Sequence, residues 1–299
     1  MLQKFFNNRF IIVFLVPFLL GSCSVLSLQP YNYLFINFLI LPTLFLLITY
    51  VVKKSKFVYR KKPFIINLFF IGYLFGIGFF LSGTYWISYS LTFDPTFQNL
   101  IFLPIILIPL LLGIFFGVAT TLVGPFLKNN FSSVLLFCSA LSFIDYLRSK
   151  ILPGFPWNLW AYSWSNFIES IQLLNLVGLF SFNLLALIAF CLPLFIFFEK
   201  KIKNLLIFSI CVLTLFANYI YGSITINENK KLYESRLKKN DNLINFKIIS
   251  PNLDLKYNLS STDLNQVIKK LIKFTFWIQG KFQETGTTLS KLKNLIFGS

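Results

Sequence analysis

Residues Phe64–Ile87 read FIINLFFIGYLFGIGFFLSGTYWI and contain no charged side chain. A run of roughly 20 apolar residues is long enough to cross the hydrocarbon core of a bilayer as a helix. The sequence therefore predicts a membrane all-α bundle of about seven transmembrane helices. The six other apolar stretches are Phe10–Leu28, Tyr33–Val52, Leu100–Leu127, Phe131–Leu147, Ile171–Phe198 and Leu205–Tyr221.

The composition of the 299-residue chain agrees with a membrane protein. Hydrophobic residues make up 56% and charged residues 12%, and the mean hydropathy is +0.73. A soluble domain carries about twice this share of charged residues. The chain has no His, which excludes a Ser-His-Asp triad and removes the commonest metal ligand. We expect neither a metal nor a cofactor.

The net charge of +17 is concentrated in alternate loops. Positive charge in short loops marks the cytoplasmic side of a membrane. With the N-terminus in the cytoplasm and one crossing per stretch, all four basic loops fall on that side, and the tail from Gly222 lies outside the cytoplasm. A nucleic-acid surface is disfavoured, because no basic stripe is interleaved with stacking aromatics on a soluble face. The four basic loops hold Lys4 and Arg9, residues 53–62, Lys128, and residues 200–203.

Arg148 and Lys150 break the charge rule after the fifth stretch. A cation at the outer surface needs a partner, and either Asp145 one helical turn earlier or a lipid phosphate would serve. All four cysteines, in contrast, fall inside apolar stretches, where small packing residues are expected. They are Cys23, Cys138, Cys191 and Cys211.

The segment after Arg148 reads Pro153-Gly154-Phe155-Pro156-Trp157. Two prolines on either side of a glycine predict a rigid turn. The nearby aromatic residues could simply form a belt at the level of the lipid headgroups. We favour a structured loop that lines a lipid-accessible groove. The aromatic residues in question are Trp157, Trp160, Tyr162 and Trp164.

The composition changes after Tyr221. Residues 222–244 form a charged connector, and Asn245–Ser250 is apolar and β-branched, as in a strand. Capping side chains at 260–263 precede an amphipathic helix, and Phe274–Ile278 is a candidate second strand. Residues 245–299 therefore read as the start of an α/β domain that is incomplete, because such a domain usually needs ~100–150 residues.

Several motifs now occur in a recognisable order. Gly154-Phe155-Pro156-Trp157 follows Asp145-x-x-Arg148, and the tail contains Ser250-Pro251-Asn252 after its first strand. Gly83–Ile87 ends the third stretch and Leu26–Tyr31 ends the first. This order resembles the bacterial apolipoprotein N-acyltransferases, and the resemblance covers nearly the whole chain.

The resemblance implies a location in the bacterial inner membrane and a periplasmic nitrilase-like (carbon-nitrogen hydrolase) domain at residues 245–299, after a membrane bundle at 1–221. It further implies a phospholipid acyl donor and an apolipoprotein acceptor. A Cys thiolate would take the acyl chain and pass it to the N-terminal S-diacylglyceryl-cysteine, with a Glu as base and a Lys for the oxyanion. The groove candidates are Arg148, Phe155, Pro156 and Trp157.

The tail departs from the family pattern. The closest match to the family's Trp-Pro-Glu motif is Trp277-Ile278-Gln279, which places Gln279 at the position of the general base. Glutamine cannot accept a proton as a carboxylate does. The family's Lys and Cys are not found, and no Cys follows Cys211. We therefore expect no acyl transfer by these residues alone.

Three other interpretations stay open. The chain could be a non-enzymatic membrane protein, either a transporter or a lipid-binding scaffold, because prolines such as Pro42 and Pro109 interrupt its helices. Leu20–Cys23 resembles a lipoprotein signal, although its removal would invert the charge pattern. Residues from Thr275 onward could come from a shifted reading frame, which the downstream DNA would reveal.

Overall fold

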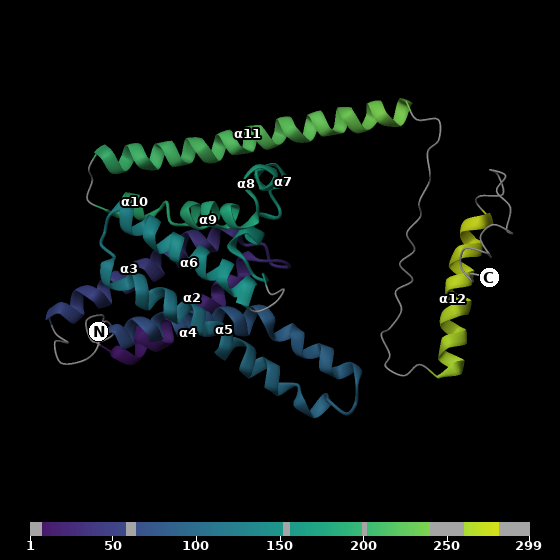
Figure 1. The fold of residues 1–299 in the computed structure, drawn as a ribbon, viewed down its shortest axis with the longest axis horizontal. Helices are drawn as coiled ribbons and strands as arrows, with labels where there is room; N and C mark the ends of the chain where they lie inside the picture. The colour runs from purple at the N-terminus through teal and green to yellow at the C-terminus, as the bar shows by residue number, and fades with distance from the viewer. Residues whose placement is uncertain (1–7, 58–63, 152–155, 199–201, 240–259, 281–299) are drawn as a thin grey trace. The chain divides into compact units, whose positions relative to one another are not determined.

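The computed structural model describes residues 8–57, 64–151, 156–198, 202–239 and 260–280 (Figure 1). The chain divides into two units. Unit 1 comprises Met1–Ser90 with Asn99–Lys239, and unit 2 comprises Leu91–Gln98 with Asn240–Ser299. Unit 1 holds the helices that position the candidate site.

Six helical segments among the described residues are long and apolar enough to cross a membrane. The first predicted span is a shorter apolar helix, Ile11–Ser27, because the chain becomes extended at Leu28 (ψ 166°). The estimate of about seven spans is corrected to six long helices and this shorter one. The main elements are η1 (Ile11–Leu15), α2 (Val16–Ser24), η2 (Val25–Ser27), α3 (Asn37–Phe57), α4 (Phe64–Thr84), α5 (Phe102–Val123) and α6 (Phe131–Ile151).

The sixth predicted span, Ile171–Phe198, is broken rather than continuous. Gly178 has φ of +75°, a conformation that L side chains rarely adopt, and it separates α8 from α9. Pro193 lacks a backbone N–H and comes just before the last short helix. The segments are α7 (Ile168–Ile171), α8 (Leu174–Val177), α9 (Leu179–Phe190) and α10 (Leu194–Phe197).

Helices α4 and α5 lie side by side and pack closely (Figure 1). Gly72 and Gly76 on α4 face Gly113 and its neighbours on α5, and a Cβ on Gly76 would lie 2.7 Å from the Cα of Gly113. Small residues four positions apart let two membrane helices approach to backbone contact. This spacing explains why α4 and α5 form the tightest helix pair in the bundle.

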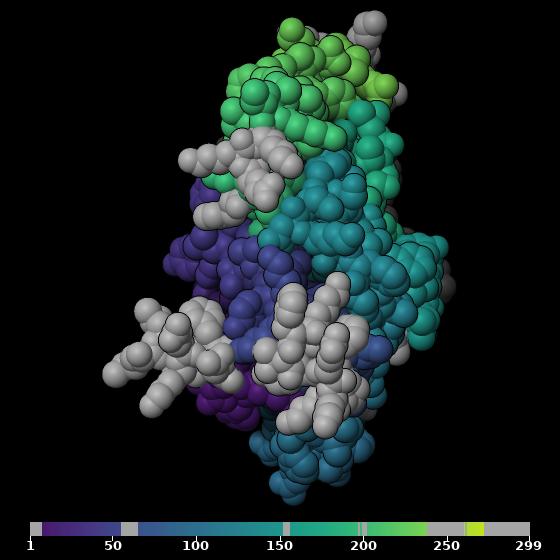
Figure 2. All heavy atoms as spheres, turned by 90° about the vertical axis from the view of Figure 1, so that its left-hand side faces the viewer, coloured from purple at the N-terminus to yellow at the C-terminus, as the bar shows by residue number. Residues whose placement is uncertain are grey.

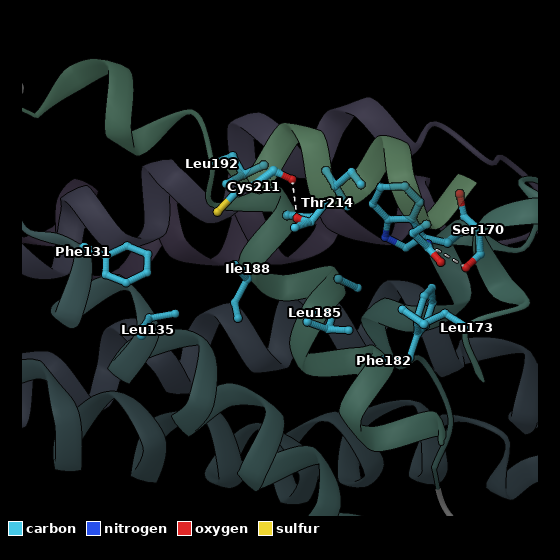
Figure 3. A pocket seen from close by; sticks show the side chains of 15 residues that line it. Phe131, Leu135, Ser170, Leu173, Phe182, Leu185, Ile188, Leu192, Cys211 and Thr214 are labelled. Carbon is cyan, nitrogen blue, oxygen red and sulfur yellow. Dashed lines mark hydrogen bonds between the residues drawn. The ribbon is translucent and has the colours of Figure 1, made fainter. Parts of the chain in front are cut away.

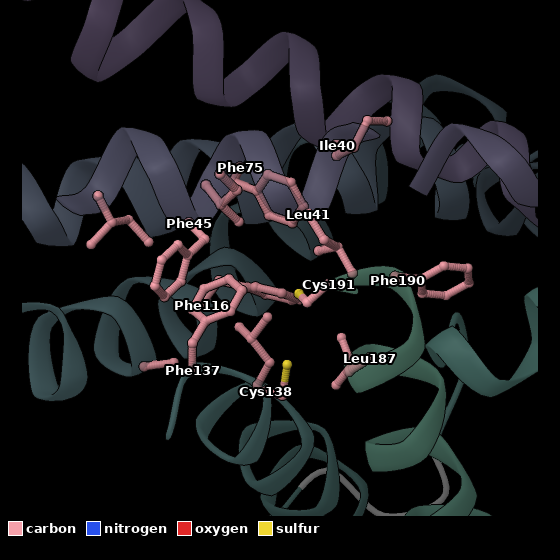
Figure 4. Packing of buried hydrophobic residues seen from close by; sticks show 14 of the residues in the cluster. Ile40, Leu41, Phe45, Phe75, Phe116, Phe137, Cys138, Leu187, Phe190 and Cys191 are labelled. Atoms are coloured by element: carbon pink, nitrogen blue, oxygen red, sulfur yellow. The ribbon is translucent and has the colours of Figure 1, made fainter. Parts of the chain in front are cut away.

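Phenylalanine fills the centre of unit 1. Phe45, Phe75, Phe116 and Phe137 are fully buried between α3, α4, α5 and α6 (Figure 4). The rings of Phe45 and Phe137 meet edge to face at 5.6 Å, a favourable aromatic geometry. Cys138 and Cys191 are free and buried in this core, as the packing interpretation requires, whereas Cys211 is partly buried and Cys23 is exposed.

The last apolar helix, α11, covers Ile202–Lys239 and so continues beyond Tyr221 into the predicted connector. In unit 2, α12 covers Ser261–Gly280. The prediction of a strand at Phe274–Ile278 is wrong, because no Gly or Pro interrupts the helical repeat between Asp263 and Gly280. The described residues contain no strand, and the predicted strand Asn245–Ser250 lies outside them.

Candidate functional site

The centre of the candidate site is a buried ion pair on α6. The Arg148 Nη2 donates to Asp145 Oδ1 at 3.0 Å, and the two side chains are 0% and 1% exposed. Two charges in an apolar environment are tolerated when they pair and their other polar atoms are also hydrogen-bonded. The expected partnership between Arg148 and Asp145 is thus present, and Arg148 lies inside the protein.

Arg148 also fixes the loop that follows α6. Its Nη1 donates to the backbone carbonyl of Trp157 at 2.9 Å. On the opposite side, the guanidinium carbon lies 5.1 Å from the centre of the Phe80 ring on α4. A cation over an aromatic face is attracted electrostatically, and more so where water is excluded. One side chain therefore connects α6, α4 and the loop.

Asn183 on α9 completes the arrangement. Its Nδ2 donates to Asp145 Oδ2 at 3.0 Å, while its Oδ1 accepts from the backbone N–H of Ala161 at 3.0 Å. Asn183 is fully buried, so both bonds form away from water. The carboxylate thereby receives Arg148 on one oxygen and Asn183 on the other. We call Asp145, Arg148 and Asn183 the polar anchor.

Aromatic stacking also holds the loop that follows α6. Trp157 stacks on Trp86 with ring centres 4.7 Å apart and an interplanar angle of 11°. Trp160 is 1% exposed and stacks against Phe79 at 5.0 Å. Trp160 is therefore a core residue and not part of an aromatic belt, whereas Trp157 is 39% exposed and meets the surroundings.

A second polar network ties the loop to the first two predicted spans. Ser163 Oγ lies 2.8 Å from Ser27 Oγ, which accepts from Asn37 Nδ2 at 2.6 Å. Ser24 Oγ donates to Asn37 Oδ1 at 2.6 Å. All four side chains are buried, and each hydroxyl or amide has a partner, which is what an apolar setting requires.

The loop also approaches the end of α4 closely. Asn158 has φ of +57°, and a Cβ on Gly83 would overlap the Nδ2 of Asn158. A side chain at position 83 would have to displace the amide of Asn158 from the end of α4. The segment Gly83–Ile87 therefore meets the loop through Gly83 and Trp86, and Leu26–Tyr31 meets it through Ser27. We call Pro156–Phe167 the anchored loop.

Tyr162 lies on the surface of the anchored loop and is 37% exposed. Its hydroxyl donates to the carbonyl of Pro156 at 3.1 Å. Burial raises the pKa of the Tyr162 phenol above its ordinary value of 10.0, and the positive charge of Arg148 opposes this only in part. The phenol is therefore a neutral hydrogen-bonding group at neutral pH.

The predicted site residues do not all lie in one place. Arg148, Pro156 and Trp157 come together at the anchor and the anchored loop. Phe155 lies outside the described residues. Gln279 lies in α12 of unit 2, so it does not follow a strand, and its assignment to the position of the family's Glu stays a prediction.

Sequence reasoning missed Asn183, Asn37 and Ser163. A signal was available, because an amide inside an apolar stretch is costly unless it finds a partner. The polar anchor orients the anchored loop, and none of its three side chains is a thiol nucleophile. Over the described ranges, no group of His, Cys, Asp or Glu side chains could hold a metal ion.

Fold and site define a polytopic helical membrane protein whose surface loop is fixed by a buried ion pair. Residues 20–192 match the family model for the apolipoprotein N-acyltransferase N-terminal domain. These residues include the polar anchor and the anchored loop, and they make up more than half of the chain. The chain belongs to the apolipoprotein N-acyltransferase family, as its motifs predicted.

Curated relatives agree with this assignment. The apolipoprotein N-acyltransferase of Rickettsia typhi is 33% identical over 220 residues, which cover 72% of this chain and 41% of the relative. That of Rickettsia prowazekii is 35% identical over 161 residues, or 53% of this chain and 32% of the relative. That of Rhizobium etli is 30% identical over 176 residues, with 58% and 32% covered. The matched part thus spans less than half the length of these relatives.

Proposed function

We propose that this chain supplies the membrane part of an apolipoprotein N-acyltransferase in the bacterial inner membrane. Its N-terminus faces the cytoplasm and its anchored loop faces the periplasm. The observation that carries the proposal is the polar anchor, which lies inside the family-matched residues and fixes a loop at one end of the bundle. A buried ion pair in a membrane helix is expensive and marks a functional position.

The anchored loop is suited to contact lipid. Trp157 and Tyr162 are partly exposed, and both carry an apolar ring with a polar edge, the kind of side chain that prefers the headgroup level. Trp157 is held by its stack on Trp86 and by the Arg148 bond to its carbonyl, so its ring is fixed before a ligand arrives. Arg148 itself is a positioning residue in this proposal, because it is fully buried.

The ligands proposed for this surface are the two substrates of the family. One is a phospholipid that donates an acyl chain, and the other is an apolipoprotein that carries a diacylglyceryl group. Both expose glycerol esters beside aliphatic chains at the membrane surface. The stacked rings of Trp157 and Trp86 and the ring of Tyr162 offer apolar surface to the chains, while the Tyr162 hydroxyl stays bonded to the carbonyl of Pro156.

We further propose that residues 1–221 form the membrane bundle, 222–244 a periplasmic connector and 245–299 part of a nitrilase-like domain. The helical path of α11 to Lys239 means that the connector begins as a continuation of that helix. Residues 1–299 hold no Cys after Cys211. The chain by itself is therefore proposed to bind lipid without transferring an acyl group, since the thioester step needs a thiolate in the periplasmic domain.

Two measurements test this function. First, a photoreactive amino acid placed at Trp157 should crosslink to phospholipid in vesicles. A probe placed at Lys128, in a loop on the opposite side, should be accessible only from the cytoplasmic side of the membrane. Second, the purified chain with phospholipid and a diacylglyceryl peptide should give no N-acylated product. Turnover above background would refute the inactivity, and a cytoplasmic reporter signal from a fusion at Ser299 would refute the orientation.

A further inference from the structure

A cavity of about 320 Å³ lies between α6, α9 and α11 of unit 1, and none of the three polar-anchor residues lines it. Small-molecule sites in proteins start near ~300 Å³, so the cavity can hold a substantial part of a ligand. Its walls are mostly Leu, Ile, Phe and Ala side chains (Figure 3). We call it the α9–α11 pocket.

The pocket has an apolar end and a polar end. Figure 3 shows Phe131 and Leu135 at one end and Ser170 and Leu173 at the other. Near Ser170 the wall also includes Trp164 and Asn218, whose Nδ2 donates to the carbonyl of Ser170 at 3.1 Å. Trp164 belongs to the anchored loop, so the polar end adjoins the proposed periplasmic side of the bundle.

Two buried polar atoms at this end lack a hydrogen-bond partner among the described residues. They are the Trp164 Nε1, which donates, and the Asn218 Oδ1, which accepts. A buried polar atom without a partner costs free energy comparable to a lost hydrogen bond. Both residues line the pocket, so a ligand inside it can reach the indole N–H and remove that cost.

The wall formed by α11 is open to its surroundings. Only 6% of the most hydrophobic window of this helix is buried, compared with 50% for α6 and 56% for the span that contains α9. Figure 2 shows the green surface of α11 along the top edge of the view, beyond the bundle. A pocket beside such a helix in a membrane is in contact with lipid chains and not with water.

We propose that the α9–α11 pocket binds one acyl chain of a membrane phospholipid, with its ester carbonyl accepting a hydrogen bond from Trp164 Nε1. In this proposal the acyl chain of the lipid extends from Trp164 past Ile188 toward Leu135, where only apolar side chains line the wall. The gradient from polar to apolar matches the order of groups in a phospholipid, from glycerol ester to methyl end. This inference goes beyond the proposed function, because it requires no acyl transfer.

The test uses the full chain in vesicles of phosphatidylethanolamine and phosphatidylglycerol that contain a phospholipid with a diazirine near the end of one acyl chain. After illumination, labelled peptides are identified by mass spectrometry. We expect label on the residues of α9 and α6 that line the apolar end. Label spread evenly along the exposed face of α11 would overturn the proposal.

Matched variants sharpen the result. Thr214 and Leu185 line the pocket but are also exposed, so Thr214→Phe and Leu185→Trp can fill it from two helices without disturbing the core. Each should reduce labelling on the order of tenfold, since a filled cavity resists further packing. Ala217→Phe is the control, because Ala217 is exposed on α11 and does not line the pocket.

Trp164→Phe tests the polar end. It keeps an aromatic ring but replaces the indole by the smaller phenyl and removes the N–H, so labelling should fall by at least the two- to tenfold that corresponds to about one hydrogen bond. Equal labelling in Thr214→Phe and Ala217→Phe would exclude the pocket as the binding site. Labelling that gives way to a crosslinked dimer as protein concentration rises would show that a second copy of the chain, and not a lipid, occupies it.

Discussion

The two sides of unit 1 are held by different physical means. On the side of the anchored loop, the Asp145–Arg148 pair and the Ser27–Asn37–Ser163 network connect α6, η2 and α3 to the loop through buried polar groups. On the side of α11, by contrast, the bond from Asn218 to the carbonyl of Ser170 joins the helix to α7, and most of the helix surface is uncovered. The comparison indicates that the buried polar groups of the bundle fix the anchored loop, whereas α11 is held by few polar contacts and most of its surface is uncovered.

The largest effect is expected from Arg148→Ala. The substitution leaves Asp145 buried without its cation and removes the bond to the Trp157 carbonyl. Breaking a buried pair by deleting one partner costs about 3–5 kcal/mol. The expected result is a large fall in the unfolding midpoint in detergent, together with faster proteolysis of the anchored loop.

Lys150→Ala is the matched control for Arg148→Ala. Lys150 lies two residues further along α6, but it is exposed, so its loss should change stability by no more than about 0.5 kcal/mol. If Arg148→Ala and Lys150→Ala proved equally stable, the polar anchor would not hold the loop and the contrast between the two sides would fail.

A moderate effect is expected from Gly222→Leu, which acts on the α11 side. Gly222 is buried against α7, and a Cβ there would overlap the carbonyl oxygen of Glu169. Overpacking at such a contact costs about 1–3 kcal/mol. Because α11 makes few other contacts, we expect it to move away from α7 while the rest of the bundle stays folded.

Crosslinking between cysteines placed on α7 and α11 would measure that movement, with Ala217→Leu as the control at an exposed position of the same helix. A global loss of the bundle in Gly222→Leu would show that α11 is as firmly integrated as the anchored loop. If Gly222→Leu crosslinked at the wild-type rate, α11 and α7 would have room for a larger side chain between Gly222 and the carbonyl of Glu169.

The spans could be predicted because hydropathy depends on local composition alone. The pairing of Asp145 with Arg148 was also accessible, since residues three apart on a helix are neighbours. The partner Asn183 was not, because it lies 38 residues further along and reaches Asp145 only through the packing of α9 on α6. The partners of Asn37 and Ser163 could not be predicted for the same reason. Hydropathy shows that a helix is apolar enough to cross a membrane, but it does not show which helix it meets.

The errors in the tail have a different cause. Phe274–Ile278 is rich in aromatic residues, which favoured a strand, whereas the helical repeat that begins at Leu264 continues through it in α12. The break at Gly178 and the pocket behind it depend on backbone conformation and on voids between side chains. Neither has a signature in composition. The spacing of Gly72 and Gly76 is typical of a close helix contact, but no prediction was drawn from it.

The smallest effect, and the most specific to the anchored loop, is the pH dependence of Tyr162. Burial raises the pKa of its phenol in the folded state. The contribution of the Tyr162 phenol to the free energy of unfolding is therefore fully present below its unfolded pKa of about 10, and it is lost as pH rises through the folded pKa.

Tyr162→Phe removes the bond to Pro156 and should lower stability at neutral pH by about 1 kcal/mol. Above about pH 10 the wild type loses its advantage, so the difference between the two unfolding midpoints should shrink. Tyr31→Phe, at an exposed position, should show a constant difference near zero. A difference for Tyr162→Phe that stays constant through the same pH range would mean that the anchored loop is as open to solvent as the α11 face.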